Sequence, residues 1–209
     1  MDGKDGGRGP LAVVLAGGLA RRMGGGDKPL VALGGQPLLR HILDRLAPQV
    51  SGLALNANGD PARYRIFGLP ILPDSLPDHP GPLVGILAAL DWAAATGRRH
   101  VLTVPGDTPF LPTDLVLRLE AAIGQGAPAT IAVSGGRRHP VVGLWPAAVR
   151  DALRRSIVEG ERRVDPWARS LGAVQVDFAA GPVDPFFNLN GPDDLVEAER
   201  LLAIERSCR

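Results

Sequence analysis

Residues 15–29, LAGGLARRMGGGDKP, have the clearest potential for chemistry, because they combine five glycines with three cationic side chains. Glycines let backbone N–H groups approach a phosphate closely, and Arg21, Arg22 and Lys28 add local positive charge. The segment is neither a Walker A loop, which requires Gly-Lys-Ser or Gly-Lys-Thr, nor the three-glycine dinucleotide pattern. Its composition predicts a cradle for a polyphosphate, and the competing interpretation is a surface loop of glycines and arginines.

The charge of the whole chain makes a local site necessary for any anionic ligand. Lys and Arg together number 23 and Asp and Glu 22, so the formal net charge is +1. A protein without a strong overall field attracts neither nucleic acid nor an anionic membrane surface. We therefore expect no nucleic acid and no membrane among its partners.

The elements around the glycine-rich segment predict where it lies. The apolar run 11–15 precedes it and is typical of a buried strand in a sheet that is covered on both faces. Further strands are predicted at 53–55, 69–72 and 100–104, with helices that begin at Pro37, at Pro82 and after the capping residue Asp114. This alternation indicates a mainly parallel α/β sheet, in which ligands bind at the carboxyl ends of the strands.

The second half of the chain is less regular. Strands are predicted at 129–133, 141–145 and 174–178, a helix from Pro146 to about Glu159, and a final helix that Pro192 opens. Because no repeat and no linker divides the chain, we expect a flexible leader at 1–10 and a single domain at 11–204. The front half of that domain would bind a nucleotide, and the back half would shape the second substrate.

The composition excludes several further classes of protein. The single cysteine, Cys208, excludes an intrachain disulfide framework and any cysteine-based zinc site. No apolar run approaches the roughly 20 residues that span a bilayer, and the first ten residues lack the apolar core of a signal peptide. We expect a cytoplasmic protein.

Several blocks of sequence, read in order, carry a resemblance to a known family. They are Leu15-Ala16-Gly17-Gly18 with Arg22-Met23-Gly24 and Asp27-Lys28, then Asn56-Ala57-Asn58, Asp74 with Gly81-Pro82-Leu83-Val84-Gly85-Ile86, Pro105-Gly106-Asp107-Thr108-Pro109-Phe110, and Phe187-Asn188-Leu189-Asn190. Together they cover residues 11 to about 203 and resemble the molybdenum cofactor guanylyltransferases. That resemblance implies a three-layer, Rossmann-like nucleotidyltransferase fold with a mainly parallel, mixed central sheet.

The resemblance also implies a reaction. The family transfers GMP from GTP to the terminal phosphate of molybdopterin, with or without bound molybdenum, and releases pyrophosphate. The attacking phosphate monoester has a second pKa of about 6 and is largely dianionic at neutral pH. Such a nucleophile needs in-line positioning and charge neutralisation rather than a general base, and Mg2+ is the expected cofactor. The back half would then bind the pterin, and the product would pass through transient contacts to molybdoenzymes or their chaperones.

Site residues follow from the same resemblance. Lys28 is expected to stabilise charge on the GTP phosphates, Arg22 to hold the leaving pyrophosphate, and Asp107 to bind both nucleotide and Mg2+. Asn56 and Asp74 are expected to contact guanosine, with the division between base and ribose left open. The backbone lining of the nucleotide is expected from Leu15, Gly17 and Gly18.

Further expectations concern the residues that would contact the second substrate. Asn188 and Asn190 lie on a segment predicted to be extended, and both are candidates for contacts to Mg2+ or to the pterin phosphate. Arg162 and Arg163 could hold the pterin phosphate or belong to a solvated charged stretch. His139, before Pro140, is more typical of a structural histidine.

Two alternatives and one departure from the family remain. Cytidylyl or other nucleotidyl transfer to a phosphate acceptor would use the same architecture. A catalytically silent GTP-binding adaptor that delivers cofactor would retain only the binding residues. The departure is Gly106, which stands where a cysteine is common in the family.

Overall fold

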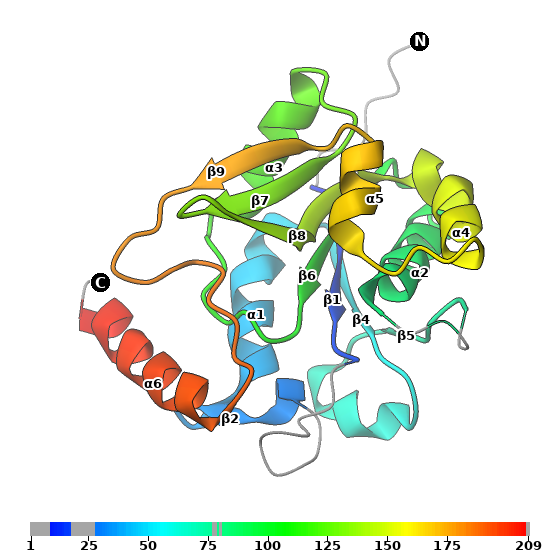
Figure 1. The fold of residues 1–209 in the computed structure, drawn as a ribbon. Helices are drawn as coiled ribbons and strands as arrows, with labels where there is room; N and C mark the ends of the chain where they lie inside the picture. Colours follow the sequence, from blue (N-terminus) through cyan, green and yellow to red (C-terminus); the bar gives the residue numbers. More distant parts are fainter. Residues whose placement is uncertain (1–8, 18–27, 77–78, 80, 208–209) are drawn as a thin grey trace.

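A computed structural model describes residues 9–17, 28–76, 79 and 81–207 (Figure 1). Seven of its strands form one sheet, in the order β5 (Ile71–Leu72), β4 (Gly52–Asn56), β1 (Leu11–Leu15), β6 (His100–Pro105), β8 (Arg137–Pro146), β7 (Thr130–Ser134) and β9 (Val174–Phe178). The first four strands are parallel, β8 is antiparallel to β6 and to β7, and β9 is parallel to β7. The predicted mainly parallel, mixed α/β sheet is confirmed.

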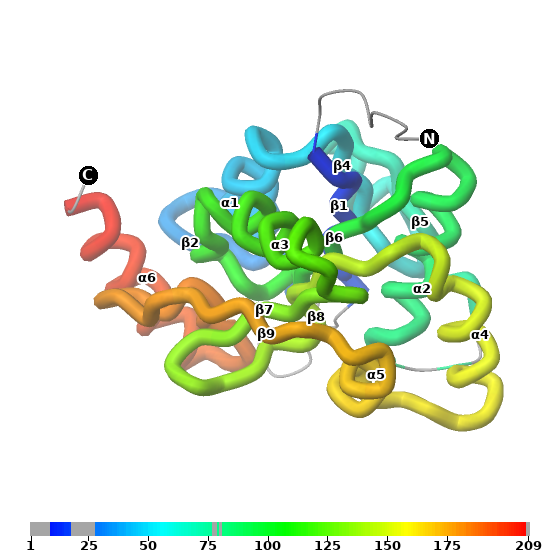
Figure 2. The backbone as a smooth tube through the Cα atoms, turned by 90° about the horizontal axis from the view of Figure 1, so that it is seen from above, coloured from blue at the N-terminus to red at the C-terminus, as the bar shows by residue number. Residues whose placement is uncertain are grey.

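Helices cover both faces of this sheet and complete three layers (Figure 2). One face carries α1 (Leu38–Leu46) and α3 (Leu115–Gly124), and the other carries α2 (Pro82–Ala95), α4 (Arg150–Val158) and α5 (Val164–Ser170). Strand β1 shows why the layers form: Ala12 and Val14 pack in one core, and Leu11 and Val13 in the other. Alternate side chains of a strand point to opposite faces, so a continuous apolar strand needs cover on both sides.

A smaller cluster joins the chain end to the glycine-rich region. Helix α6 (Pro192–Ser207) packs through Leu201 and Leu202 against Leu33, Leu38 and neighbouring apolar residues. Leu33 belongs to the short hairpin of β2 (Ala32–Leu33) and β3 (Gln36–Pro37). This packing brings the segment before α6 close to the 3-10 helix η2 (Lys28–Leu30), which follows the glycine-rich segment.

The antiparallel half differs from its prediction. The strand expected at 141–145 is ten residues long and pairs with β6 up to Pro146, so the helix predicted from Pro146 instead begins at Arg150, after the 3-10 turn η5 (Ala147–Val149). The backbone N–H of Ala147 donates to Arg99 O at 2.7 Å, which holds this region in the strand.

Three further differences concern local elements. Helix α5 and the 3-10 helix η4 (Pro61–Phe67) were not expected. Asp114 precedes α3 as predicted, but its side chain makes no cap hydrogen bond and instead lies 3.8 Å from Arg118. Within the described ranges, no helix combines the length and apolar character that a membrane crossing requires.

Candidate active site

Three neighbouring strands end in one row and bring the predicted residues to one edge of the sheet. Leu15 pairs with Asn56 of β4 on one side and with Pro105 of β6 on the other. The pairing continues past the strands, because Ala16 N donates to Asn56 O at 2.8 Å and Gly106 N donates to Leu15 O at 3.0 Å. Parallel strands bind ligands at this edge, so the register itself places Leu15, Asn56 and the Asp107 turn together.

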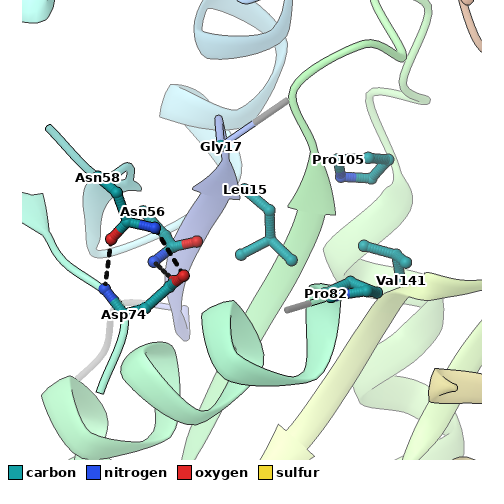
Figure 3. Close-up of a pocket in the computed structure, with 9 residues that line it drawn as sticks. Leu15, Gly17, Asn56, Asn58, Asp74, Pro82, Pro105 and Val141 are labelled. Atoms are coloured by element: carbon teal, nitrogen blue, oxygen red, sulfur yellow. Dashed lines mark hydrogen bonds between the residues drawn. The ribbon is translucent and has the colours of Figure 1, made fainter. Parts of the chain in front are cut away.

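A cavity of about 330 Å³ opens at this edge, and we call it the strand-end cavity (Figure 3). Its volume lies at the lower end of the range for small-molecule sites. It is lined by Leu15, Gly17, Asn56, Asn58, Asp74, Gly81, Pro82, Pro105 and Val141. Of the expected nucleotide residues, Leu15, Gly17, Asn56 and Asp74 therefore share one cavity, whereas Gly18 and Arg22 lie outside the described residues.

Two asparagines hold the Asp74 carboxylate in this cavity. Asn56 Nδ2 donates to Asp74 Oδ1 at 2.9 Å, and Asn58 Nδ2 donates to Asp74 Oδ2 at 2.6 Å. Asn58 Oδ1 also accepts from Asp74 N at 3.0 Å (Figure 3). The side-chain amide of Asn58 therefore holds Asp74 through both its nitrogen and its oxygen. Sequence reasoning gave Asn58 no role, although its spacing of two from Asn56 places both side chains on one side of an extended chain.

A glycine of α2 makes room for Asn56. A Cβ at Gly85 would lie 2.4 Å from Asn56 Oδ1 and 3.1 Å from Leu15 Cδ2. Contacts this short force a neighbour to move, so Gly85 is the residue that lets the helix approach the asparagine. In the sequence, Gly85 lies within the block 81–86 that resembles the family, but the block gives no sign that Gly85 packs against Asn56.

Lys28 stands at the centre of a second polar group beside the cavity. Its Nζ lies 2.6 Å from Asp107 Oδ2 and 3.1 Å from Asn190 Oδ1, and its side chain is only 12% exposed. The three residues come from η2, from the turn after β6 and from the segment before α6. The structure thus brings together three residues that the sequence separates by 79 and 162 positions.

Among the described residues, one oxygen of Asp107 has no hydrogen-bond partner. This atom, Oδ1, is buried, and burial raises the pKa of the carboxyl above its ordinary value against the opposing effect of Lys28. A buried carboxylate oxygen without a donor is a natural ligand for a hard cation, and Mg2+ in nucleotide sites uses one or two carboxylates plus phosphate oxygens. Within the described ranges, no group of three or more His, Cys, Asp or Glu side chains is placed to hold a metal ion, so a cation at Asp107 would need further ligands from outside these side chains.

The turn at Gly106 is packed tightly against the glycine-rich strand end. A Cβ at Gly106 would lie 3.0 Å from Leu15 O and 3.1 Å from Pro29 Cγ. Pro29 is buried and directly follows Lys28. The turn that carries Asp107 therefore packs closely against both the end of β1 and the residue that follows Lys28.

The remaining candidates divide into two groups. Asn188 and Asn190 lie on residues 179–191, which form no strand or helix. Asn190 accepts a hydrogen bond from Lys28, and Asn188 lines a separate pocket, where its buried Oδ1 has no partner among the described residues. Arg162 Nη1 instead donates to Ile157 O and Glu161 O at the end of α4, and neither Arg162 nor Arg163 lines the strand-end cavity.

This three-layer fold, with polar groups gathered where its parallel strands end, is of the kind found in solved nucleotidyltransferase structures. A solved structure of similar fold is molybdopterin-guanine dinucleotide biosynthesis protein A from Archaeoglobus fulgidus, with TM-score 0.71, 24% identity and coverage of 93% of this chain and 99% of that chain. The fold is also shared by a CMP:2-keto-3-deoxy-manno-octonic acid synthetase complexed with CTP, with TM-score 0.68, 16% identity and coverage of 95% and 100%.

Sequence comparison identifies the family. The family model of the MobA-like NTP transferase domain matches residues 12–174. Molybdenum cofactor guanylyltransferases from Mesorhizobium japonicum and Nitrobacter hamburgensis are 54% and 50% identical, covering 91% and 92% of this chain and 94% of each relative. The chain belongs to the molybdenum cofactor guanylyltransferase family and is a nucleotidyltransferase.

Proposed function

We propose that this enzyme transfers GMP from GTP to the terminal phosphate of molybdopterin, free or molybdenum-loaded, and releases pyrophosphate. The observation that carries this proposal is the Lys28–Asp107–Asn190 group at the strand ends, next to a cavity that contains Asp74. The names of the relatives supply the acceptor class. We expect the reaction in the cytoplasm, with transient contacts to the molybdoenzymes or chaperones that receive the product.

The chain's residues have to position two phosphates and neutralise their charge. An oxygen of the acceptor phosphate forms a bond to the α-phosphorus of GTP, and the bond from that phosphorus to the bridging oxygen breaks as pyrophosphate leaves. Lys28 would move from Asp107 to the nucleotide phosphates, where its ammonium stabilises the charge that develops. Arg22 would hold the leaving pyrophosphate, and the backbone at Gly17 and Gly18 would line the phosphates.

Asp107 would hold Mg2+ through Oδ1, which has no partner in the part of the chain that the structure describes. The bound cation would neutralise phosphate charge and fix the geometry of the triphosphate. When Lys28 leaves Asp107 for the phosphates, the second carboxylate oxygen also becomes free. The same two side chains would therefore be paired with each other before binding and with ligand afterwards.

Asp74 and its two asparagines give a physical route to guanine selection. Each carboxylate oxygen carries more than one lone pair, so Asp74 can accept from Asn56 and Asn58 and still accept from a ligand. Guanine presents N1–H and the N2 amino group side by side, whereas adenine has no N–H at N1. A fixed carboxylate in the cavity would accept from both guanine groups.

The first experiment measures pyrophosphate release by purified protein with Mg2+ and the pterin acceptor, separately with GTP, CTP, ATP and UTP. We expect release with GTP alone. Release with CTP alone would keep the reaction class and overturn the assignment of guanine to Asn56 and Asp74. GTP binding without release with any nucleotide would favour the adaptor alternative.

A further inference from the structure

A second pocket borders the strand-end cavity, and we call it the hairpin pocket. It has a volume of about 170 Å³ and is lined by Pro105, Thr108, Arg137, Arg138, His139, Pro140, Val141, Val142, Phe186 and Asn188. Pro105 and Val141 line both cavities. Pro105 and Thr108 flank Asp107 in the sequence, and Leu189 N donates to Asp107 O at 3.0 Å. A ligand in the hairpin pocket would therefore lie beside the proposed site of phosphate transfer.

A break in strand pairing forms one wall of this pocket. On β7, Ile131 pairs with Gly143 and the next residue, Ala132, pairs with His139, so 140–142 have no partner on β7. Pro140 has no N–H to offer a ladder, and bulges of this kind re-aim side chains near functional sites. Val141 O accepts from Thr103 Oγ1 at 2.8 Å, which holds the bulge against β6.

Ser134, itself bonded to Asp184, holds the ring of His139 at this wall. Ser134 Oγ donates to Asp184 Oδ1 at 2.7 Å and lies 2.9 Å from His139 Nε2. Because an ionised carboxylate only accepts, the single hydroxyl proton is used on Asp184 and Ser134 must accept from His139. Neutral His139 therefore carries its proton on Nε2, and Nδ1 presents a lone pair. Among the described residues, Nδ1 has no hydrogen-bond partner.

The pocket thus presents hydrogen-bond acceptors and positive charge together. Burial lowers the pKa of His139, although Asp184 opposes the shift, and this favours the neutral ring with its free Nδ1. Among the described residues, Asn188 Oδ1 is a second acceptor without a partner. The pocket is also lined by Arg137 and by Arg138, whose Nε lies 2.6 Å from Asp165 Oδ1. The ring of His139 packs on Phe186 with centroids 4.7 Å apart, so the wall is also aromatic.

We propose that His139 accepts a hydrogen bond from the N–H edge of the acceptor's pterin ring in the hairpin pocket, and that Ser134 and Asp184 are positioning residues for that contact. A 2-amino-4-oxo ring offers adjacent N–H donors, and its phosphate would extend past Pro105 toward Asp107. This inference rests on the proposed function, because it takes the acceptor to be a pterin phosphate.

The test uses the full chain and the monophosphate ester of 6-hydroxymethylpterin as probe. Its Kd is measured by pterin fluorescence, and the Kd of GTP by calorimetry, for the wild type, Ser134→Ala and the control Ser156→Ala. Ser156 Oγ donates only to Ala152 O within α4, so its loss should change neither constant. We expect Ser134→Ala to weaken the probe about 3- to 10-fold, the effect of one hydrogen bond, with GTP affinity within about twofold.

A second measurement distinguishes a binding contact from mere loss of structure. The chain has four histidines, so 15N-labelled histidine gives a small set of ring signals. We expect His139 as the Nε2–H tautomer, with its Nδ1 signal shifting when the probe binds. Absence of probe binding, equal affinity in Ser134→Ala, or an unmoved His139 signal would overturn the inference. Failure of the proposed function is separate, because it would show as no pyrophosphate release from GTP by the wild type even where the probe binds.

Discussion

The strand-end cavity and the hairpin pocket meet at Pro105 and Val141, but the chain builds them in different ways. The strand-end cavity takes its polar residues from the ends of parallel strands and the loops that follow them, and the strand register alone aligns Leu15 with Asn56. The hairpin pocket depends on an unpaired bulge in β8 and on residues 179–191, which belong to no strand or helix.

This difference indicates which changes in sequence each region tolerates. A residue at the end of a parallel strand is held by the whole ladder, so its position survives changes in the loop beyond it. A residue on a bulge is held by a few side-chain hydrogen bonds, such as those from Ser134 to Asp184 and His139. We infer that substitutions around the strand-end cavity alter nucleotide use, and those around the hairpin pocket alter acceptor use.

The largest effect is expected from Lys28→Ala, because Lys28 contacts Asp107 on one side and Asn190 on the other. Loss of its ammonium should lower kcat by about 10²- to 10³-fold, the usual penalty for removing one charge stabiliser. Pyrophosphate release measures this, with Arg40→Ala as control because Arg40 and Asp44 form an exposed pair 3.8 Å apart. An unchanged kcat in folded Lys28→Ala protein would remove Lys28 from the reaction.

A smaller effect is expected from Asp74→Asn in the strand-end cavity. The new amide nitrogen would face an asparagine donor and could not accept from guanine, so kcat/KM for GTP should fall about 10- to 100-fold. Preference for GTP over ITP, which lacks the 2-amino group, should shrink as well, while the acceptor KM stays constant. Asp44→Asn serves as the exposed control. A full GTP preference in Asp74→Asn would place guanine recognition elsewhere.

Gly85→Ala tests the packing behind Asn56. The added Cβ would overlap Asn56 Oδ1, so we expect a destabilisation of about 1–3 kcal/mol and a KM for GTP raised about 10-fold. Gly124→Ala is the matched control, since nothing lies within 4 Å of its Cβ position in helix α3. Denaturant unfolding and steady-state kinetics give the two readouts. Equal behaviour of the two alanine variants would contradict the role assigned to Gly85.

The smallest effect concerns the pH dependence of stability in the hairpin pocket. Burial lowers the pKa of His139, with Asp184 opposing and Arg137 reinforcing the shift. The unfolded chain therefore binds the proton more readily than the folded protein near the ordinary value of about 6.5. The contribution of His139 to the free energy of unfolding is therefore present above that pH. It is lost as the pH falls through the lower pKa of the folded protein.

His139→Phe removes this titration and keeps a ring against Phe186. We expect the Tm of the wild type to fall relative to that of His139→Phe as the pH is lowered from about 7 to about 5. Two Tm curves that stay parallel across this range would show that the histidine is not held neutral by its surroundings.

The sequence predicted the strand-end cavity better than the hairpin pocket for a physical reason. Hydrophobic runs mark buried strands, and the residue after such a run lies at the carboxyl edge whatever follows. Asn56, Asp74 and Asp107 each follow a predicted strand, which agrees with a place at this edge, but they were chosen as site residues from the resemblance to the family. Asn58 was missed because its contact with Asp74 depends on how the loop after β4 folds back.

The antiparallel half could not be predicted to the same degree. Pairing of Pro146 with His100 extended β8 over residues that a helix pattern also fits. Nothing in the local sequence indicates that Ser134, His139 and Asp184 lie close together. A bulge and a segment without regular structure bring them into contact. His139 was expected to be structural, and its bond to Ser134 agrees with that expectation. No other described residue bonds Nδ1, which is the atom of the proposed contact.

Gly106 gives this chain a constraint on its evolution. A Cβ at position 106 would lie 3.0 Å from Leu15 O, 3.1 Å from Pro29 Cγ and 3.3 Å from Ala16 Cα. A side chain there, such as the cysteine that is common in the family, would need these neighbours to shift by a few tenths of an ångström. Substitutions at 106 are therefore coupled both to residue 29 and to the backbone that follows β1.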